Sequence, residues 1–181
     1  MVLAAARDVL ADRGLASVTM RELARRLGVA PNALYSHVES RTALLDELLD
    51  DLLAAVVVPD PDTAEPVAGL VDLMSSTYHV LTAHAELVPV YLARQGARGP
   101  NAVRLGHLVD AMLARAGVGA ADVAAARRVL IVHAIGSAAF TTGPPDEPAA
   151  DRPLSAADLE RTFSRSLRWL LDGITDGAGS R

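Results

Sequence analysis

Two short segments near the amino terminus carry side chains that could read the edges of DNA bases. Arg21 lies near the start of a helix predicted over residues 20–27, and Asn32 lies at the start of a second helix predicted over 31–38. Arg and Asn side chains can form paired hydrogen bonds to bases in the major groove. The outward positions of the second helix are small or polar, which lets a backbone approach bases closely; they are Asn32, Ala33, Tyr35, Ser36 and His37.

The elements that position these side chains form a helix-turn-helix. Thr19 and Glu22 fit a capping box at the start of the first helix, in which each side chain bonds to the other residue's backbone amide. A tight turn at Gly28 joins the two helices, and Leu23 and Leu34 point inward. The second helix of such a pair can lie in the major groove. An ordinary helical hairpin has the same spacing, so the pattern alone leaves both interpretations open.

Apolar residues recur at helical spacing along almost the whole chain, which predicts an all-α fold. We expect an N-terminal three-helix DNA-binding domain over residues 1–41 and a C-terminal helical domain over residues 42–181. Helix 42–58, which Ser40 can cap, connects the two. Further helices are predicted over residues 65–83, 89–96, 100–116, 120–140 and 155–174.

The composition removes several classes of chemistry. The 181-residue chain has no cysteine, and its 17 basic residues are all arginine. The sequence therefore offers no disulfide, thiolate nucleophile, Schiff-base lysine or phosphate-loop lysine. His79 and His84 fall on different helix faces, which does not suit a shared metal ion. We expect no enzyme activity, no catalytic residues, no cofactor and no metal site.

Charge is distributed unevenly along the chain. Residues 1–41 hold six Arg against four acidic residues, whereas the remainder is acidic and brings the net charge to −5. A polyanion is therefore expected to bind the first quarter only. The longest apolar run, 129–140, is shorter than the roughly 18 residues that cross a bilayer. The first residues show no signal-peptide pattern. We expect a cytoplasmic protein with no membrane partner.

The segment Gly14–Val29, GLASVTMRELARRLGV, resembles the DNA-binding domain of the TetR family, as do LYSHV at 34–38 and SRTALL at 40–45. The resemblance covers about residues 2–55 and is particularly close to the tetracycline-repressor branch. It implies that Arg21 contacts a base and that Pro31, Asn32 and Ala33 begin the recognition helix. It also implies contacts to the DNA backbone or groove from Thr19, Tyr35, His37 and Arg41.

Two apolar stripes in the C-terminal part predict a dimer interface. The resemblance implies a domain that dimerises and binds a ligand, and two helices here carry wide apolar faces. The stripe members on helices 120–140 and 155–174 are Leu130, Ala134, Ala138, Leu159, Phe163, Leu167 and Leu170. Their width favours a four-helix interface across a twofold axis. The alternative, in which both stripes pack within one subunit, stays open.

Polar or polarizable residues on otherwise apolar faces predict the lining of a ligand pocket. These residues are Met74, Tyr78, Tyr91, His107, Met112 and His133. Each of them has an alternative role in the core, as a hydrogen-bonded histidine or as a methionine that fills a gap.

Together these observations predict a ligand-responsive transcriptional regulator, and the resemblance implies a homodimeric repressor of a palindromic double-stranded DNA operator. A small-molecule effector would move helix 42–58 and change the spacing of the two recognition helices. The alternative is a small helical ligand-binding protein that retains the motif but no longer regulates DNA, and the net charge of −5 supports it. Salt-dependent affinity for random duplex separates the two.

Overall fold

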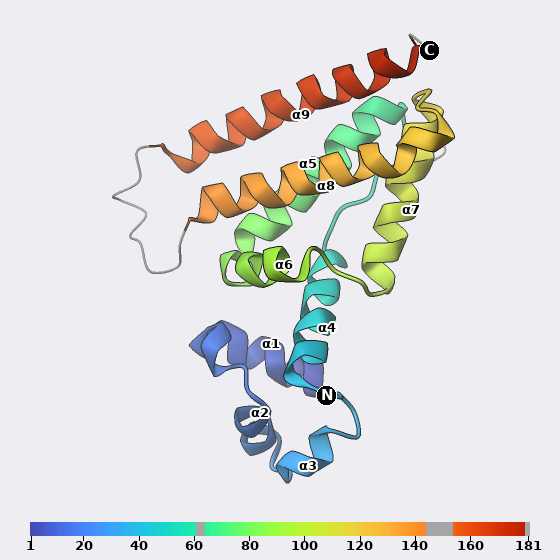
Figure 1. Cartoon of the computed structure of the whole chain (residues 1–181). Helices are drawn as coiled ribbons and strands as arrows, with labels where there is room; N and C mark the ends of the chain where they lie inside the picture. Colours follow the sequence, from blue (N-terminus) through green and yellow to red (C-terminus); the bar gives the residue numbers. More distant parts are fainter. Residues whose placement is uncertain (61–63, 144–153, 180–181) are drawn as a thin grey trace.

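The computed structural model describes residues 1–60, 64–143 and 154–179, and these are helical with no β-strand among them (Figure 1). The predicted all-α fold class is confirmed. Two short 3-10 helices, η1 (Leu15–Ser17) and η2 (Ala85–Leu87), accompany the α-helices. The α-helices are α1 (Val2–Arg13), α2 (Met20–Leu27), α3 (Pro31–Leu34), α4 (Arg41–Leu53), α5 (Pro66–Ala83), α6 (Val88–Arg94), α7 (Pro100–Arg115), α8 (Ala120–Thr142) and α9 (Ala156–Gly179).

The helices form two groups, with α4 leading from one into the other (Figure 1). Helices α1–α3 pack together below, while α8 packs against α5, α7 and α9 above. Helix α4 contacts α1 in the first group and both α5 and α7 in the second. Because α4 takes part in the packing of both groups, the domain boundary between residues 41 and 42 stays a prediction.

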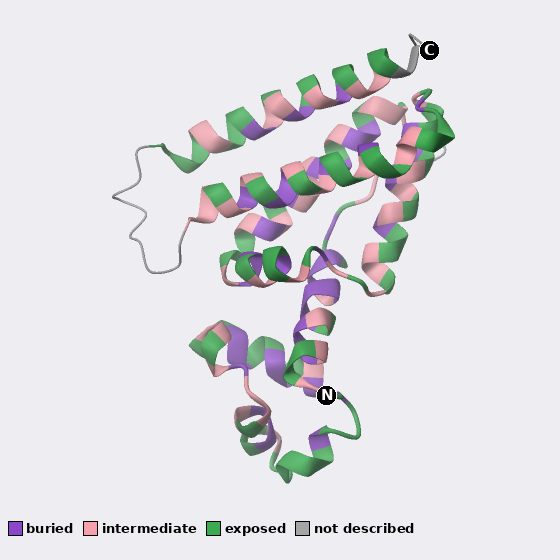
Figure 2. Ribbon diagram, viewed as in Figure 1, coloured by how far each residue is buried: buried purple, intermediate pink, exposed green. Residues whose placement is uncertain are grey.

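Buried residues lie on the helix faces that are turned toward other helices (Figure 2), and their apolar side chains form the core. In the first group Leu23, Leu34 and Val38 are buried, as their predicted inward positions require. In the second group Tyr78 of α5 stacks on Phe163 of α9 with ring centroids 4.2 Å apart. The core therefore joins helices that are far apart in the sequence.

Helix α3 is shorter than the predicted helix 31–38, because it ends at Leu34. In a continued helix the His37 amide would donate to the Ala33 carbonyl. The Ser36 hydroxyl occupies that carbonyl at 2.7 Å, and the His37 amide donates to Leu34 at 2.9 Å instead. Residues 35–37 form a turn, after which the Val38 amide donates to the Leu34 carbonyl at 3.0 Å.

Helix α4 also ends earlier than the predicted 42–58, at Leu53. The next three amides donate to carbonyls three residues back, which tightens and closes the last turn. The Val57 amide then donates to the Ser76 hydroxyl of α5 at 2.8 Å. The connection between the two groups is thus a helix followed by a short segment fastened to α5.

Helix α8 meets the length and composition criterion for a membrane-spanning helix, which the search for uninterrupted apolar runs missed. The core helix of a soluble protein meets the same criterion, so this is weak evidence. Here α8 packs against α5, α7 and α9, and its apolar composition is accounted for in part by those contacts.

Candidate nucleic-acid interface and ligand cavity

Local sequence sets the geometry between α2 and α3. The Thr19 hydroxyl accepts a hydrogen bond from the Glu22 amide at 3.2 Å and so caps α2. Gly28 ends α2 with a φ of 68°, a left-handed conformation that costs other residues about 1 kcal/mol. Pro31 begins α3, where its fixed φ is favourable and an amide proton is not needed.

Only half of the predicted capping box forms. The Glu22 carboxylate does not reach back to the Thr19 amide, which donates to the Ser17 carbonyl at 2.9 Å. The Glu22 carboxylate instead accepts hydrogen bonds from Arg25 at 2.6 and 2.8 Å and from Arg13 at 3.2 Å. The hydrogen bond from Arg25 lowers the pKa of the Glu22 carboxyl, so this residue is ionised at neutral pH.

This pairing distinguishes Arg21 from its neighbours on α2. Arg25 is paired with Glu22, and Arg26 is paired with Asp12 at 2.9 Å. Arg21 is exposed and has no ion-pair partner within the described residues. Its charge is therefore the one on α2 that remains available to an external anion or base.

The structure brings the remaining predicted residues together on one outer surface that spans the start of α3 and the turn after it. Tyr35 is 52% exposed, which is unusual for a ring of that size and leaves it available to a partner. The exposed residues of this surface are Pro31, Asn32, Ala33, Tyr35, Ser36 and His37. Their contacts to DNA stay predictions.

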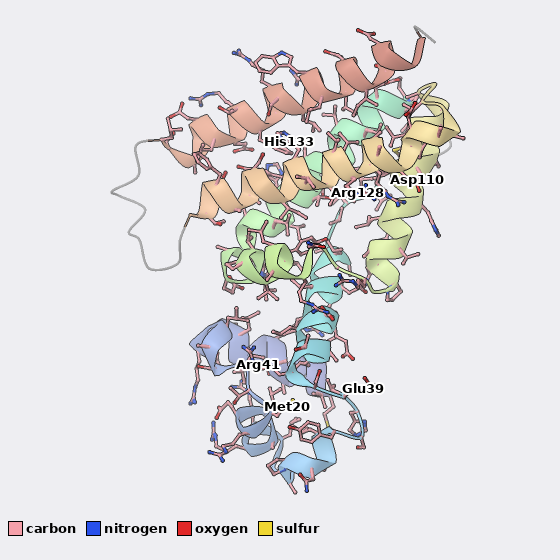
Figure 3. The ribbon with its side chains drawn as sticks, viewed as in Figure 1. Met20, Glu39, Arg41, Asp110, Arg128 and His133 are labelled. Atoms are coloured by element: carbon pink, nitrogen blue, oxygen red, sulfur yellow. The ribbon has the colours of Figure 1, made fainter. Side chains whose placement is uncertain are left out.

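Arg41 has a structural role that the sequence did not reveal (Figure 3). Its guanidinium donates to the Val18 carbonyl at 2.7 Å and to the Leu15 carbonyl at 3.3 Å. These bonds tie the start of α4 to the segment between α1 and α2. The phosphate contact of Arg41 stays a prediction. It would have to use the guanidinium N–H groups that do not take part in these two hydrogen bonds.

A cavity of about 140 Å³ lies among α5, α6, α7, α8 and the end of α4. Of the six predicted ligand-binding residues, Met74 and Tyr91 line it. Burial raises the pKa of the Tyr91 hydroxyl, while the backbone amide of Ala97 lowers it in part as a hydrogen-bond donor. Tyr91 is therefore a neutral phenol at neutral pH.

The other four predicted ligand-binding residues lie away from this cavity. Tyr78 bonds to the Thr141 hydroxyl at 2.8 Å, and burial raises its pKa. His133 stacks on Phe163 and bonds to the Ser166 hydroxyl at 3.1 Å (Figure 3). These two residues join α5 and α8 to α9, which corresponds to the predicted alternative of a core role.

Met112 and His107 also lie outside the lining of this cavity. Met112 is fully buried and its methyl group packs toward Gly69 of α5, so it fills the core. His107 is exposed, because α7 turns the face with Leu105 and Val109 inward. His107 lies two residues from each of them, on the opposite side of the helix.

The prediction missed most of the residues that line the cavity. They are Leu53, Thr77, Gln95, Gly96, Ala97, Ala102, Leu105, Gly106, Val109, Ile131 and Ile135. Gln95 has a φ of 56°, and with Gly96 it forms the sharp end of α6. A Gln-Gly pair after a short helix was the available sequence signal for this turn.

Two carboxylates of α4, one helical turn apart, connect it to the wall of the cavity. Asp46 accepts two hydrogen bonds from Arg94 at the end of α6, at 2.6 and 2.7 Å. Asp50 is buried and accepts from the backbone amides of Asn101 and Ala102 at 3.1 and 2.9 Å. Asp50 thereby caps the start of α7 from a different helix.

The structure describes a single chain, so the predicted dimer interface stays a prediction. Leu130, Ala134, Ala138, Phe163 and Leu167 are buried within a single chain, because α5 and the facing helix cover them. Leu159 and Leu170 are half-buried. The apolar residues that α8 and α9 leave exposed are others, namely Val129, Val132, Phe140 and Trp169. No group of three or more potential metal-ligating side chains occurs within the described ranges.

Comparison with known proteins agrees with this architecture. The family model described as "Bacterial regulatory proteins, tetR family" matches residues 2–48. An HTH-type transcriptional regulator of Saccharopolyspora erythraea is 28% identical over 200 residues, covering 98% of this chain and 84% of that protein. The class A tetracycline repressor from transposon 1721 of Escherichia coli is 47% identical over 53 residues, covering 29% of this chain and 24% of the repressor.

Among solved structures, BioQ with its natural double-stranded DNA operator superposes with a TM-score of 0.75 at 27% identity. The match covers 97% of this chain and 96% of BioQ. The similarity thus extends over both helix groups, whereas the high identity to the tetracycline repressor is confined to a short segment.

Proposed function

The chain belongs to the TetR family of bacterial regulatory proteins, and from that premise we propose that it is a transcriptional repressor released from DNA by a small-molecule effector. It would bind a palindromic operator as a homodimer in the cytoplasm. The observation that carries this proposal is the exposed surface of α2 and α3, with an unpaired arginine and an exposed asparagine on a helix-turn-helix. The operator complex of BioQ supports duplex DNA as the partner.

On DNA, Arg21 and the start of α3 would read base edges in the major groove. Asn32 is the residue of α3 that can hydrogen-bond a base in two places. Tyr35 and His37, in the turn after α3, would contact phosphate or the groove wall. Arg41 would contribute chiefly by holding the segment between α1 and α2 in place.

We propose that the outer faces of α8 and α9 form the homodimer interface. Val129, Val132 and Phe140 recur on α8 at spacings of three and eight residues, which places them on one face. They are 43%, 62% and 69% exposed in the single chain, and Trp169 of α9 is 66% exposed. A second copy related by a twofold axis would cover both faces and set the two recognition helices about 34 Å apart.

An effector in the cavity would act on DNA binding through α4. Leu53, the last residue of α4, lines the cavity. The Asp46–Arg94 pair and the Asp50 cap fasten the same helix to α6 and α7. A shift of the α6–α7 turn would therefore move α4 and with it α1–α3.

Selection from a randomised duplex library, followed by fluorescence anisotropy, tests this function. A palindromic consensus is expected, with affinity that falls steeply as salt increases. Arg21→Ala is expected to weaken the selected site by about 1–3 kcal/mol and to relax one base position. Arg104→Ala, which removes an exposed arginine of α7, is the matched control and should change neither. Absence of salt-dependent binding would favour a ligand-binding protein without a role on DNA.

A further inference from the structure

The cavity has a size and a chemistry that restrict what it can hold. Its volume is about 140 Å³, similar to the roughly 150 Å³ of an apolar cavity known to hold benzene. The thirteen residues that line it include aliphatic side chains from three helices, α4, α7 and α8, and no charged residue. Burying an ion there would leave it without a counter-charge among the lining residues.

Two hydroxyl groups provide most of the polar character of the lining. Tyr91 lines the cavity, and its phenol has a proton that it can donate. The Thr77 hydroxyl donates to the Leu73 carbonyl at 2.8 Å, so its oxygen is left to accept. The lining therefore offers one donor and one acceptor to a bound molecule. The exposed Gln95 adds an amide at the edge.

We propose that the cavity binds a small uncharged molecule, about one ring in size and mostly apolar, that carries a hydroxyl or carbonyl oxygen. The inference rests on the proposed function, because the bound molecule would be the effector of the proposed regulator. The oxygen would bond to Tyr91 and Thr77, and the ring would contact Met74 and the aliphatic wall.

Several ionised groups near the lining residues have partners of their own, among them Asp110, which follows Val109 and is paired with Arg127. Arg94 precedes Gln95 but is held by Asp46 through two hydrogen bonds. Asp50 is held by the start of α7. A carboxylate or ammonium ligand that recruited one of these groups would have to break its present pairing, which adds to the desolvation cost of the ligand.

Methionine methyl NMR on the full chain gives a direct test. Benzyl alcohol, benzoate and benzylamine share one ring and one attached carbon but differ in charge. Of the four methionines, Met74 lines the cavity, whereas Met112 is buried beside Gly69 outside the lining. Benzyl alcohol is expected to shift the Met74 methyl signal in a saturable manner and to leave Met112 much less affected. Both ions are expected to bind about 100-fold more weakly.

Two variants locate the polar contact. Tyr91→Phe removes the donor and is expected to weaken benzyl alcohol about 5-fold to 10-fold without changing toluene. Tyr78→Phe is the matched control, because that buried hydroxyl bonds to Thr141 outside the cavity. Equal effects of the two variants would overturn the role of Tyr91.

Other outcomes separate the class of ligand from the function. Benzoate or benzylamine binding as tightly as benzyl alcohol at Met74 would overturn the uncharged class. A lack of any Met74 shift with benzyl alcohol, toluene and cyclohexanone would overturn the site, and tighter binding of 2-naphthol than of benzyl alcohol would overturn the one-ring size. DNA anisotropy is measured separately on the ligand-free protein, so a failure to bind DNA would refute the proposed function without touching these results.

Discussion

Replacing Asp50 by alanine is expected to destabilise the chain more than any other single carboxylate of α4. The start of α7 has Gly99 and Pro100 before its first free amides, and neither side chain can cap them. The Asp50 carboxylate accepts from the amides of Asn101 and Ala102 and also from the Asn101 side chain at 3.1 Å. Without it these donors lose their partner.

The magnitude follows from these hydrogen bonds. Loss of a capping side chain costs about 0.5–2 kcal/mol, and a hydrogen bond to a charged group contributes about 1.5–3 kcal/mol. For one carboxylate that serves two backbone amides, we expect a loss of about 3 kcal/mol in the free energy of unfolding. In a chain of this length such a loss lowers the melting temperature by about 6–12 °C.

Urea unfolding at one fixed protein concentration measures the effect, since association alters the stability of a dimer. Glu47→Ala removes an exposed carboxylate from the same helix and is expected to cost no more than about 0.5 kcal/mol. Gly99→Ala would disturb the same contact from the α7 side, because the added methyl group would lie 2.5 Å from the Asp50 Oδ2 atom and would clash with it. If Asp50→Ala were no more destabilising than Glu47→Ala, the assignment of Asp50 as the cap of α7 would be refuted.

Three further predictions concern DNA, assembly and pH. Asn32→Ala is expected to cost about 1–3 kcal/mol on the selected operator and little on random duplex, as measured by anisotropy; equal losses on both would contradict base reading. Val132→Glu should give a folded monomer in sedimentation and circular dichroism, because this side chain is 62% exposed in the single chain; a dimeric variant would place the interface elsewhere. The Ala68 amide, followed by that of Val67, lowers the pKa of Glu65. The stability from this cap is therefore fully present above the ordinary pKa and is lost as pH falls through the lowered one. Urea unfolding at several acidic pH values should show that the Glu65→Gln variant lacks this pH-dependent loss of stability. An NMR titration in which the Glu65 carboxyl has its ordinary pKa would contradict the prediction.

The sequence predicted the N-terminal group well because its signals are local. The Thr19 cap, the left-handed Gly28 and the inward Leu34 each depend on residues a few positions away. The end of α3 at Leu34 could not be predicted from periodicity, because Leu34 and Val38 are buried although a turn, not a helix, separates them.

The C-terminal group was predicted less well because its residues respond to distant neighbours. The stripe with Leu130 and Leu167 was correctly identified as apolar, but periodicity does not say whether α5 or a second subunit covers it. The exposed position of His107 could not be predicted, because one polar residue on an apolar helix does not show which face of the helix is buried. The Asp50 cap joins residues about 50 positions apart, for which a single sequence contains no signal.

The residues that stabilise the helix-turn-helix differ from the residues that α3 exposes, and this has a consequence for how such a regulator changes its target. The residues that hold the helix-turn-helix are Thr19, Leu34 and Arg41, through a cap, a buried side chain and two backbone carbonyls. The residues offered to DNA, such as Asn32 and Ala33, are exposed and outside this framework. Substitutions at positions 32 and 33, other than to Gly or Pro, are therefore expected to cost no more than about 0.5 kcal/mol of stability. Operator preference in this chain can diverge, or be reprogrammed by design, independently of stability.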